Sequence, residues 1–221
     1  MNNQKKFHCY TIGHSNHLIE DFIQTLKNFQ IQCIIDIRTI PSSNYIPQYN
    51  RENLQSWLER EGIEYEYLGD RIGGRYTDPD LLDSQGSVDY EKVEQRSIFQ
   101  TGIDQVCQII NRGKPAALMC SEKDPLDCHR FVLVSKALTK KGISIDHIVF
   151  EGTKDTEGKL VGSLVSNNDL EKKLQEMYKS PNEMDKEMLY RRRNKEMAFN
   201  INGKTNKIKN EVNRQLDSFF S

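Results

Sequence analysis

The sequence lacks a long apolar run, an excess of one charge and a regular set of cysteines. Its 31 basic and 32 acidic residues leave a formal net charge of -1, so no overall basic field attracts nucleic acid. No apolar stretch approaches the roughly 20 residues that a membrane-spanning helix needs. The five cysteines are odd in number and have no framework spacing. Because no secretory signal pattern is visible either, we expect a reduced, cytoplasmic protein without a membrane partner.

Hydrophobic residues are also scarce for a globular protein, at 36% of 221 residues, which predicts a polar extension beside one full core. Strand-like and helix-like segments alternate along residues 1–150, which predicts an α/β domain with three layers and a mainly parallel β-sheet flanked by helices. Residues 151–221 are predicted to form a hairpin and a helical C-terminal extension. The predicted strands cover residues 7–12, 31–37, 63–68, 116–119 and 143–150. Helices are predicted over 18–29, 51–61, 97–112, 131–141, 169–179 and 183–198.

The stretch from Pro115 to Arg130 carries the densest set of reactive side chains. Residues 116–119 are a short apolar run, which is typical of a strand covered on both faces. Residues 131–141 have the periodicity of a helix. We therefore expect Cys120 at the carboxyl end of a strand, and residues 128–130 in the first turn of the next helix, where unpaired N–H groups favour anions.

Polar motifs follow the other predicted strands as well. Because the carboxyl ends of parallel strands meet at one edge of a sheet, where ligands of open α/β sheets bind, we expect these motifs to form one pocket. We predict catalytic roles for His14, Cys120, Glu122, Cys128 and His129, and substrate-binding roles for Ser15, Arg38, Ser42, Gly73, Gly74, Arg75 and Arg130.

The cysteines allow two interpretations. A cysteine at a helix N-terminus beside a cation has a lowered pKa and can act as a nucleophile, which would suit Cys128 or Cys120. The alternative is that both are small packing residues. A phosphatase-type loop has an arginine six residues after its cysteine, but Leu126 stands six after Cys120. His14 has the titration range of a general base, or it shapes the loop at Ser15 through a hydrogen bond.

A metal site is a further alternative for the same side chains. The seven residues between the two cysteines of the stretch match no standard zinc spacing. We therefore assign no metal ligand and identify no cofactor from the sequence. The side chains that such a site would draw on are Cys120, Cys128, His129, His14 and His147.

Three arginines favour an anionic ligand. Guanidinium groups bind phosphate or carboxylate through paired hydrogen bonds, and Arg38, Arg75 and Arg130 all belong to the predicted pocket. Gly73-Gly74 is a weak phosphate-loop signal, because no complete nucleotide-binding motif surrounds it. The densest basic run, Arg191–Arg193, predicts either contact with nucleic acid or a solvated helix face balanced by neighbouring acids.

Several motifs stand in a fixed order along the chain. They are Thr11-Ile-Gly-His-Ser15, Asp36-Ile-Arg38 with Pro41 and Ser42, Gly62-Ile-Glu-Tyr65, Leu68-Gly69, Gly73-Gly74, Cys120-Ser-Glu-Lys-Asp-Pro125, Cys128-His-Arg130 and His147-Ile148. This ordered set closely resembles the uncharacterised family called domain of unknown function 488, over roughly residues 8 to 150. The resemblance implies a bacterial or archaeal cytoplasmic α/β domain without a settled reaction.

The leading hypothesis is therefore an enzyme, of hydrolase or transferase type, that acts on an anionic, phosphate-bearing substrate related to a nucleotide or nucleic acid. One alternative is a non-catalytic module that binds a nucleotide or nucleic acid at the same edge of the sheet. Another is a metal-dependent enzyme with Cys and His ligands. The sequence assigns no oligomeric state.

Overall fold

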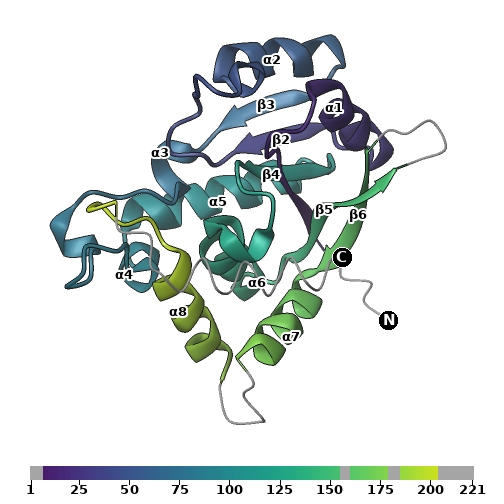
Figure 1. Ribbon diagram of the computed structural model, residues 1–221. Helices are drawn as coiled ribbons and strands as arrows, with labels where there is room; N and C mark the ends of the chain where they lie inside the picture. Colours follow the sequence, from purple (N-terminus) through teal and green to yellow (C-terminus); the bar gives the residue numbers. More distant parts are fainter. Residues whose placement is uncertain (1–6, 155–159, 179–184, 204–221) are drawn as a thin grey trace.

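The computed structural model describes residues 7–154, 160–178 and 185–203 (Figure 1). In these residues a six-stranded sheet forms the centre, in the order β3-β2-β4-β1-β5-β6. The first five strands are parallel, and β6 pairs antiparallel with β5. The strands are β1 (His8–Gly13), β2 (Cys33–Asp36), β3 (Glu64–Tyr67), β4 (Ala116–Cys120), β5 (Ser144–Lys154) and β6 (Leu160–Ser166).

Helices cover both faces of this sheet. Two separate sets of buried side chains lie on its two sides, and β4 contributes to both: Met119 joins one set and Leu118 the other. This confirms the predicted three-layer α/β fold and the strand covered on both faces. On one face lie α1 (Ile19–Asn28) and α2 (Arg51–Arg60), and on the other α5 (Ser97–Asn111) and α6 (Lys136–Lys140) (Figure 1).

The strand order creates a natural binding position at β2 and β4. These strands are neighbours, but the chain continues from β2 to β3 on one side and from β4 to β5 on the other. The two following loops therefore diverge, and in open α/β sheets ligands bind in the crevice that such a divergence leaves.

The segment after β4 differs from the single helix predicted over residues 131–141. A 3₁₀ turn (Pro125–Asp127) comes first, and a π-helical segment (Arg130–Ser135) then leads into α6. Between them Cys128 is extended, with φ -129° and ψ 142°, whereas His129 is already helical. Single π-helical turns are frequent at functional sites. Here the change from extended backbone at Cys128 to helical backbone at His129 lets these two adjacent side chains point toward the same site.

Residues 76–96 form an excursion between β3 and α5, and the part around Tyr90 is bonded to two other segments of the chain. The α3 helix (Gly69–Ile72) precedes it, and η2 (Pro79–Leu81) and α4 (Tyr90–Glu94) lie within it. Tyr90 is buried, and its hydroxyl donates to the Gly74 carbonyl at 3.1 Å. The N–H of Val88 donates to the carbonyl of Phe199 at 2.9 Å, so the excursion joins the C-terminal part of the chain.

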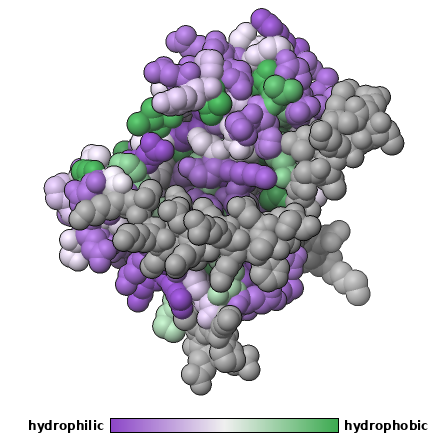
Figure 2. All heavy atoms as spheres, viewed as in Figure 1, coloured by the Kyte–Doolittle hydropathy of each residue, from purple (hydrophilic) through white to green (hydrophobic). Residues whose placement is uncertain are grey.

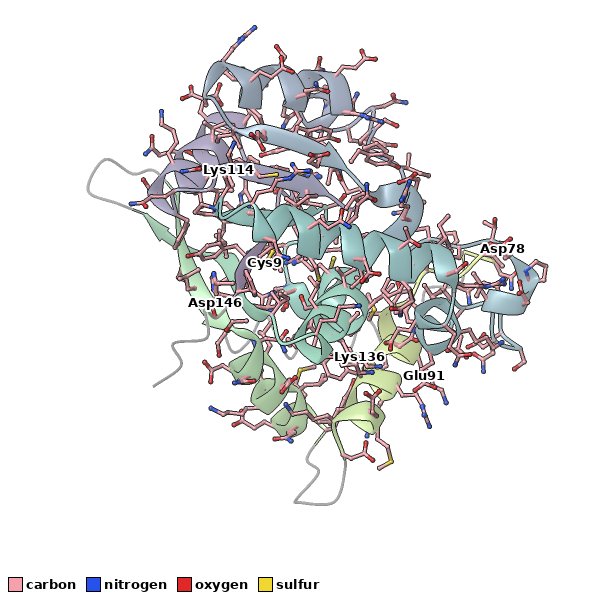
Figure 3. All side chains as sticks on the ribbon, turned by 180° about the vertical axis from the view of Figure 1, so that it is seen from behind. Cys9, Asp78, Glu91, Lys114, Lys136 and Asp146 are labelled. Carbon is pink, nitrogen blue, oxygen red and sulfur yellow. The ribbon has the colours of Figure 1, made fainter. Side chains whose placement is uncertain are left out.

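The C-terminal extension is helical, as predicted, and it packs against the domain. Lys136 of α6 lies 2.8 Å from carboxylate oxygens of both Glu94 and Glu187, and so connects α4, α6 and α8. Figure 3 shows Lys136 and Glu91 near the place where these helices meet. The helices are α7 (Asn167–Met177) and α8 (Lys186–Met197), whereas residues 155–159 of the predicted hairpin and the end of the chain beyond 203 lie outside the described residues.

On the face seen in Figure 2, most of the coloured residues are hydrophilic, and apolar residues form only small groups. None of the described helices is long and apolar enough to cross a membrane.

Candidate functional site

The loops after β1 and β4 start at the same level of the sheet. Gly13 pairs with Cys120 and Asp36 with Met119. The N–H of His14 donates to the Cys120 carbonyl at 3.0 Å, so the two loops are bonded to each other. The polar motifs after β1, β2 and β4 thus meet at one edge, as expected from a parallel sheet.

A pocket of about 270 Å³ opens at this edge. It takes residues from the loops after β2 and β4, from the glycine motif after α3, and from the end of α8. The lining residues are Arg38, Thr39, Ile40, Gly74, Arg75, Tyr90, Cys120, Ser121, Glu122, Asp127, His129, Glu196, Met197, Ala198, Phe199, Asn200 and Gly203.

Two thiols, a carboxylate and an imidazole meet at the floor of the pocket. Donor atoms of Cys120, Glu122, Cys128 and His129 all lie within 4.8 Å of one another. The Cys120 thiol donates to Glu122 Oε2 at 2.8 Å, and the Cys128 thiol donates to the same oxygen at 3.1 Å. Glu122 is half-buried, whereas the other three side chains are buried. We call these four residues the thiol cluster.

The ring of His129 is oriented by the backbone. Its Nε2 lies 3.1 Å from the carbonyl oxygen of Ile37, an acceptor, so Nε2 carries the proton that it donates there. In the neutral ring, Nδ1 then keeps its lone pair. This atom faces the two sulfurs, at 3.6 Å from Cys120 Sγ and 3.8 Å from Cys128 Sγ.

The charge states of the thiol cluster follow from its surroundings. Burial raises the pKa of both the Cys120 and the Cys128 thiol, so these groups keep their protons and donate. Burial acts against ionisation of Glu122 as well, but nearby His129 and the two thiol hydrogen bonds outweigh it and lower its pKa to about 2. Burial opposes protonation of His129, yet contact with Cys128 and the charge of Glu122 raise the imidazole pKa.

Arg38 is held in a fixed orientation beside the thiol cluster. Its Nε donates to Asp36 Oδ1 at 2.9 Å and its Nη2 to Asp36 Oδ2 at 2.6 Å. Its Nη1 lies 3.2 Å from Nε2 of His14, and Tyr65 donates its hydroxyl to Asp36 at 2.7 Å. Arg38 lines the pocket although it is only 5% exposed, so the pocket presents a preoriented guanidinium.

His14 lies behind Arg38 and is not one of the residues that line the pocket. Its Nδ1 is 2.8 Å from the Ser15 carbonyl, and Nδ1 therefore donates, which leaves Nε2 to accept from Arg38. Burial and the charge of Arg38 lower its pKa to about 4, and the ring also stacks on Tyr49 at 4.1 Å. Both nitrogens are engaged, so the arrangement supports a positioning role in place of the predicted general base.

Arg130 is fully buried and holds the loop that carries Glu122. Its Nη1 donates to the Glu122 carbonyl at 2.6 Å and its Nη2 to the Lys123 carbonyl at 2.8 Å. Gly13 makes this approach possible, because a Cβ there would lie 1.8 Å from the Glu122 carbonyl oxygen. Arg130 is not part of the pocket lining, so its contacts differ from the predicted anion binding.

The glycine motif brings the chain close to the imidazole. A Cβ at Gly74 would lie 2.6 Å from Cγ of His129, and one at Gly73 would lie 2.3 Å from Oγ1 of Thr39. The motif therefore serves close packing beside the thiol cluster. Arg75, which follows, is exposed and lies over the ring of Phe199 at 5.6 Å, at the rim of the pocket.

Three further candidates lie outside the pocket lining. Ser15 has a positive φ of 47° and donates its hydroxyl to Asn16, and Ser42 is exposed. His147 is buried under the sheet edge and has a partner at each nitrogen: Thr11 Oγ1 at 2.7 Å and Asn167 Oδ1 at 3.2 Å.

The contribution of the C-terminal part of the chain to the pocket could not be predicted from the sequence. Arg193 is buried, donates its Nε to the Leu126 carbonyl at 3.0 Å, and forms ion pairs with Asp127 and Glu196. It thereby fixes the end of α8 against the loop after β4. Apolar spacing in α8 predicts a packed face, but it does not name the surface against which that face packs.

The basic run Arg191–Arg193 is balanced by acids. Arg191 pairs with Glu91 at 2.8 Å, and Arg192 lies 3.6 Å from Glu196 and over the ring of Tyr178. Contact of this run with nucleic acid stays a prediction. Arg191 and Arg192 lie on a solvated helix face, whereas Arg193 is buried.

Comparison with known families gives one match. A family model described as "Domain of unknown function DUF488" matches residues 18–137, more than half of the 221-residue chain. This range includes the thiol cluster, Arg38 and Arg75. Neither the curated proteins nor the solved structures gave a match.

Proposed function

The chain belongs to the domain of unknown function DUF488 family, and because that name states no activity, we propose from the site itself that the protein is an enzyme acting on an anionic, phosphate-bearing substrate. Arg38 and Arg75 bind the anion, and the thiol cluster supplies the reacting groups. The observation that carries the proposal is a preoriented arginine in a pocket whose floor is a group of proton donors and acceptors.

The orientation of Arg38 is the first support. A guanidinium has five N–H donors, and the contacts to Asp36 and His14 use three of them. Within the described residues, two N–H donors are left without a partner. Because the side chain is already fixed, little conformational entropy is lost when an anion binds to these donors.

The charge balance of the pocket is the second support. Asp127 and Glu196 line the pocket but already pair with Arg193, and Glu122 accepts from both thiols. Arg75, by contrast, has no acidic partner among the described residues. An anion between Arg38 and Arg75 would therefore add charge-assisted hydrogen bonds without displacing an existing ion pair.

The roles within the reaction follow from exposure to the pocket. Glu122 and His129 line it and are the groups that would accept or donate protons. Cys120 lines it too, whereas Cys128 is fully buried behind. A reacting phosphate held by Arg38 would lie beside Cys120, Glu122 and His129, which is the proximity that catalysis requires.

Binding of phosphorylated ligands to arginine variants tests the proposal. Calorimetric titration with inorganic phosphate and with nucleoside mono- and triphosphates is expected to find binding that Arg75→Glu weakens by about 10- to 100-fold, the loss of one or two charge-assisted hydrogen bonds. Arg38→Lys keeps the charge but loses the fork geometry, and should weaken binding as well. Arg75 is exposed, so its variant keeps the fold.

Arg112→Glu is the matched control, because Arg112 is exposed and precedes β4 at the opposite edge of the sheet. It should leave the affinity unchanged. Equal affinity in wild type and Arg75→Glu would overturn the proposal, as would the absence of binding by every phosphorylated ligand tested. Binding without turnover of any of these ligands would favour the non-catalytic module.

A further inference from the structure

We propose that Cys120, Cys128, His129 and Glu122 bind one thiophilic divalent metal ion, with zinc as the expected ion. This deepens the proposed function, since it assigns the chemistry of the same pocket, and it can be tested without any substrate. Two thiolates, an imidazole nitrogen and a carboxylate oxygen are a ligand set that suits zinc.

The distances between donor atoms agree with tetrahedral coordination. With Zn–S bonds of about 2.3 Å and a Zn–N bond of about 2.05 Å, a tetrahedral angle separates sulfur and nitrogen by about 3.6 Å. The observed distances from His129 Nδ1 are 3.6 Å to Cys120 Sγ and 3.8 Å to Cys128 Sγ. Both sulfurs are thus spaced from the imidazole nitrogen as around a zinc ion, and all four donor atoms lie within 4.8 Å of one another.

Glu122 is the ligand that must move. Its Oε2 lies 2.8 and 3.1 Å from the sulfurs, closer than the roughly 3.6 Å that separates oxygen and sulfur around a tetrahedral zinc ion. When a metal ion replaces both thiol protons, which leave to the solvent, the oxygen has to move away from the sulfurs by roughly 0.5–0.8 Å. The half-buried position of Glu122 allows that shift.

The surroundings of the thiol cluster are those of a metal site. A metal-bound histidine almost always donates its second ring N–H to a carboxylate or a backbone carbonyl, which fixes the ring, and His129 donates in this way to Ile37. The backbone N–H of Arg130 donates to Cys128 Sγ at 3.4 Å. A divalent ion with two thiolates and a carboxylate carries a net charge of -1, and the buried guanidinium of Arg130 compensates it.

The ion would face the pocket. Cys120, Glu122 and His129 line the pocket, whereas Cys128 holds the rear position. The carboxylate is the ligand that can exchange for a water or a substrate oxygen. The anion held by Arg38 and Arg75 would then meet a Lewis acid. All four residues of the thiol cluster would act as ligands, in place of a nucleophilic role for the thiols and a proton-transfer role for His129 and Glu122.

Metal analysis of the full-length protein, purified under reducing conditions, tests the inference. We expect about one zinc per chain, or one after reconstitution of the chelated protein with Zn²⁺. Reconstitution with Co²⁺ should give the absorption of a tetrahedral, thiolate-bound ion. Cys120→Ser and Cys128→Ser should each lower the affinity for Zn²⁺ by at least 100-fold.

Two further variants keep the test decisive. Cys107→Ser changes a half-buried cysteine of α5 and should bind zinc like wild type. Glu122→Gln changes the half-buried ligand, should fold, and should lower the affinity about 10- to 100-fold. No stoichiometric binding after reconstitution would overturn the inference, as would full binding in the Cys120→Ser/Cys128→Ser double variant.

The outcomes separate this inference from the proposed function. Zinc bound by wild type together with no affinity for any phosphorylated ligand would keep the metal site and remove the anionic substrate. If the protein binds no metal but binds phosphorylated ligands with an affinity that depends on Arg75, the anionic substrate is kept and the metal site is removed.

Discussion

Two groups of buried polar side chains lie under the same sheet, and they differ in how completely their hydrogen bonds are satisfied. We call the first the histidine network: Thr11, His147, Asn167, Glu171 and Tyr190. There Asn167 accepts from the His147 ring and donates to Glu171, and Tyr190 also donates to Glu171 at 2.9 Å. In the thiol cluster, two donors share a single carboxylate oxygen, and the lone pair of His129 faces sulfur.

The difference shows that burial of polar groups does not identify a functional site. The histidine network connects β1 and β5 with α7 and α8, has a partner for each ring nitrogen, and contributes no residue to the pocket. The thiol cluster contributes three residues to the pocket and has spare capacity to bind a ligand. We infer that the first group serves stability and the second serves chemistry, and three changes test this.

The largest effect on stability is expected for Asn167→Leu. The substitution leaves the buried His147 N–H without its acceptor, and a buried polar group without a partner costs about 1–3 kcal/mol. Glu171 Oε1 keeps the hydrogen bond from the Tyr190 hydroxyl. We expect the free energy of unfolding, measured with urea, to fall by about 1–3 kcal/mol, while affinity for zinc stays the same. Asn168→Leu is the matched control, because Asn168 is exposed. Equal stability of both variants would contradict the structural role.

The next effect is a dependence of stability on pH. Burial and the charge of Arg130 lower the pKa of His147 to about 3, against the hydrogen bond to Asn167, whereas the unfolded chain binds this proton near pH 6.5. Between these pH values the unfolded state binds more protons than the folded state. The contribution of neutral His147 to the free energy of unfolding is therefore fully present above pH 6.5, and it falls on acidification by up to about 1.4 kcal/mol per pH unit.

Replacing the histidine should remove this contribution. The stability difference between wild type and His147→Asn should therefore shrink from pH 6.5 to pH 4, as urea unfolding across that range can measure. His8→Asn serves as a control, because His8 lies at the start of β1 and is partly exposed. A difference that stays constant with pH would show that His147 binds its proton equally well in the folded and unfolded states, which contradicts the lowered pKa.

The smallest effect on stability is expected for Cys128→Ala in the presence of a chelator. A loss of about 1 kcal/mol, typical of a point mutation, is expected, and Cys33→Ala in β2 should cost a similar amount. With zinc at 100 times the dissociation constant, wild type gains about 2.7 kcal/mol from binding, and Cys128→Ala should not. Thermal unfolding with and without zinc measures both values. A large loss in the chelator would make Cys128 a packing residue.

Much of the fold could be predicted from the sequence. The apolar runs and the helical periods identify the five parallel strands and their crossovers, and the edge of the sheet where Cys120 and Arg38 lie follows from the parallel arrangement. These features depend on local pattern, which is why one sequence suffices for them.

Parts of the site could not be predicted, because they depend on contacts between distant segments or on irregular backbone. Cys128 and His129 are adjacent in sequence, and only the change from extended to helical backbone between them lets both face Cys120. The buried position of Arg130 depends on the close approach at Gly13. The return of α8 to the pocket depends on Arg193, more than 60 residues beyond its partner Leu126.

The central claim is that the thiol cluster is the chemical centre of the pocket, and X-ray absorption at the zinc edge of the reconstituted, full-length protein tests it most directly. The account predicts two sulfur ligands at about 2.3 Å and two nitrogen or oxygen ligands at about 2.0–2.1 Å. A spectrum without sulfur ligands, or a protein that retains no zinc, would contradict it.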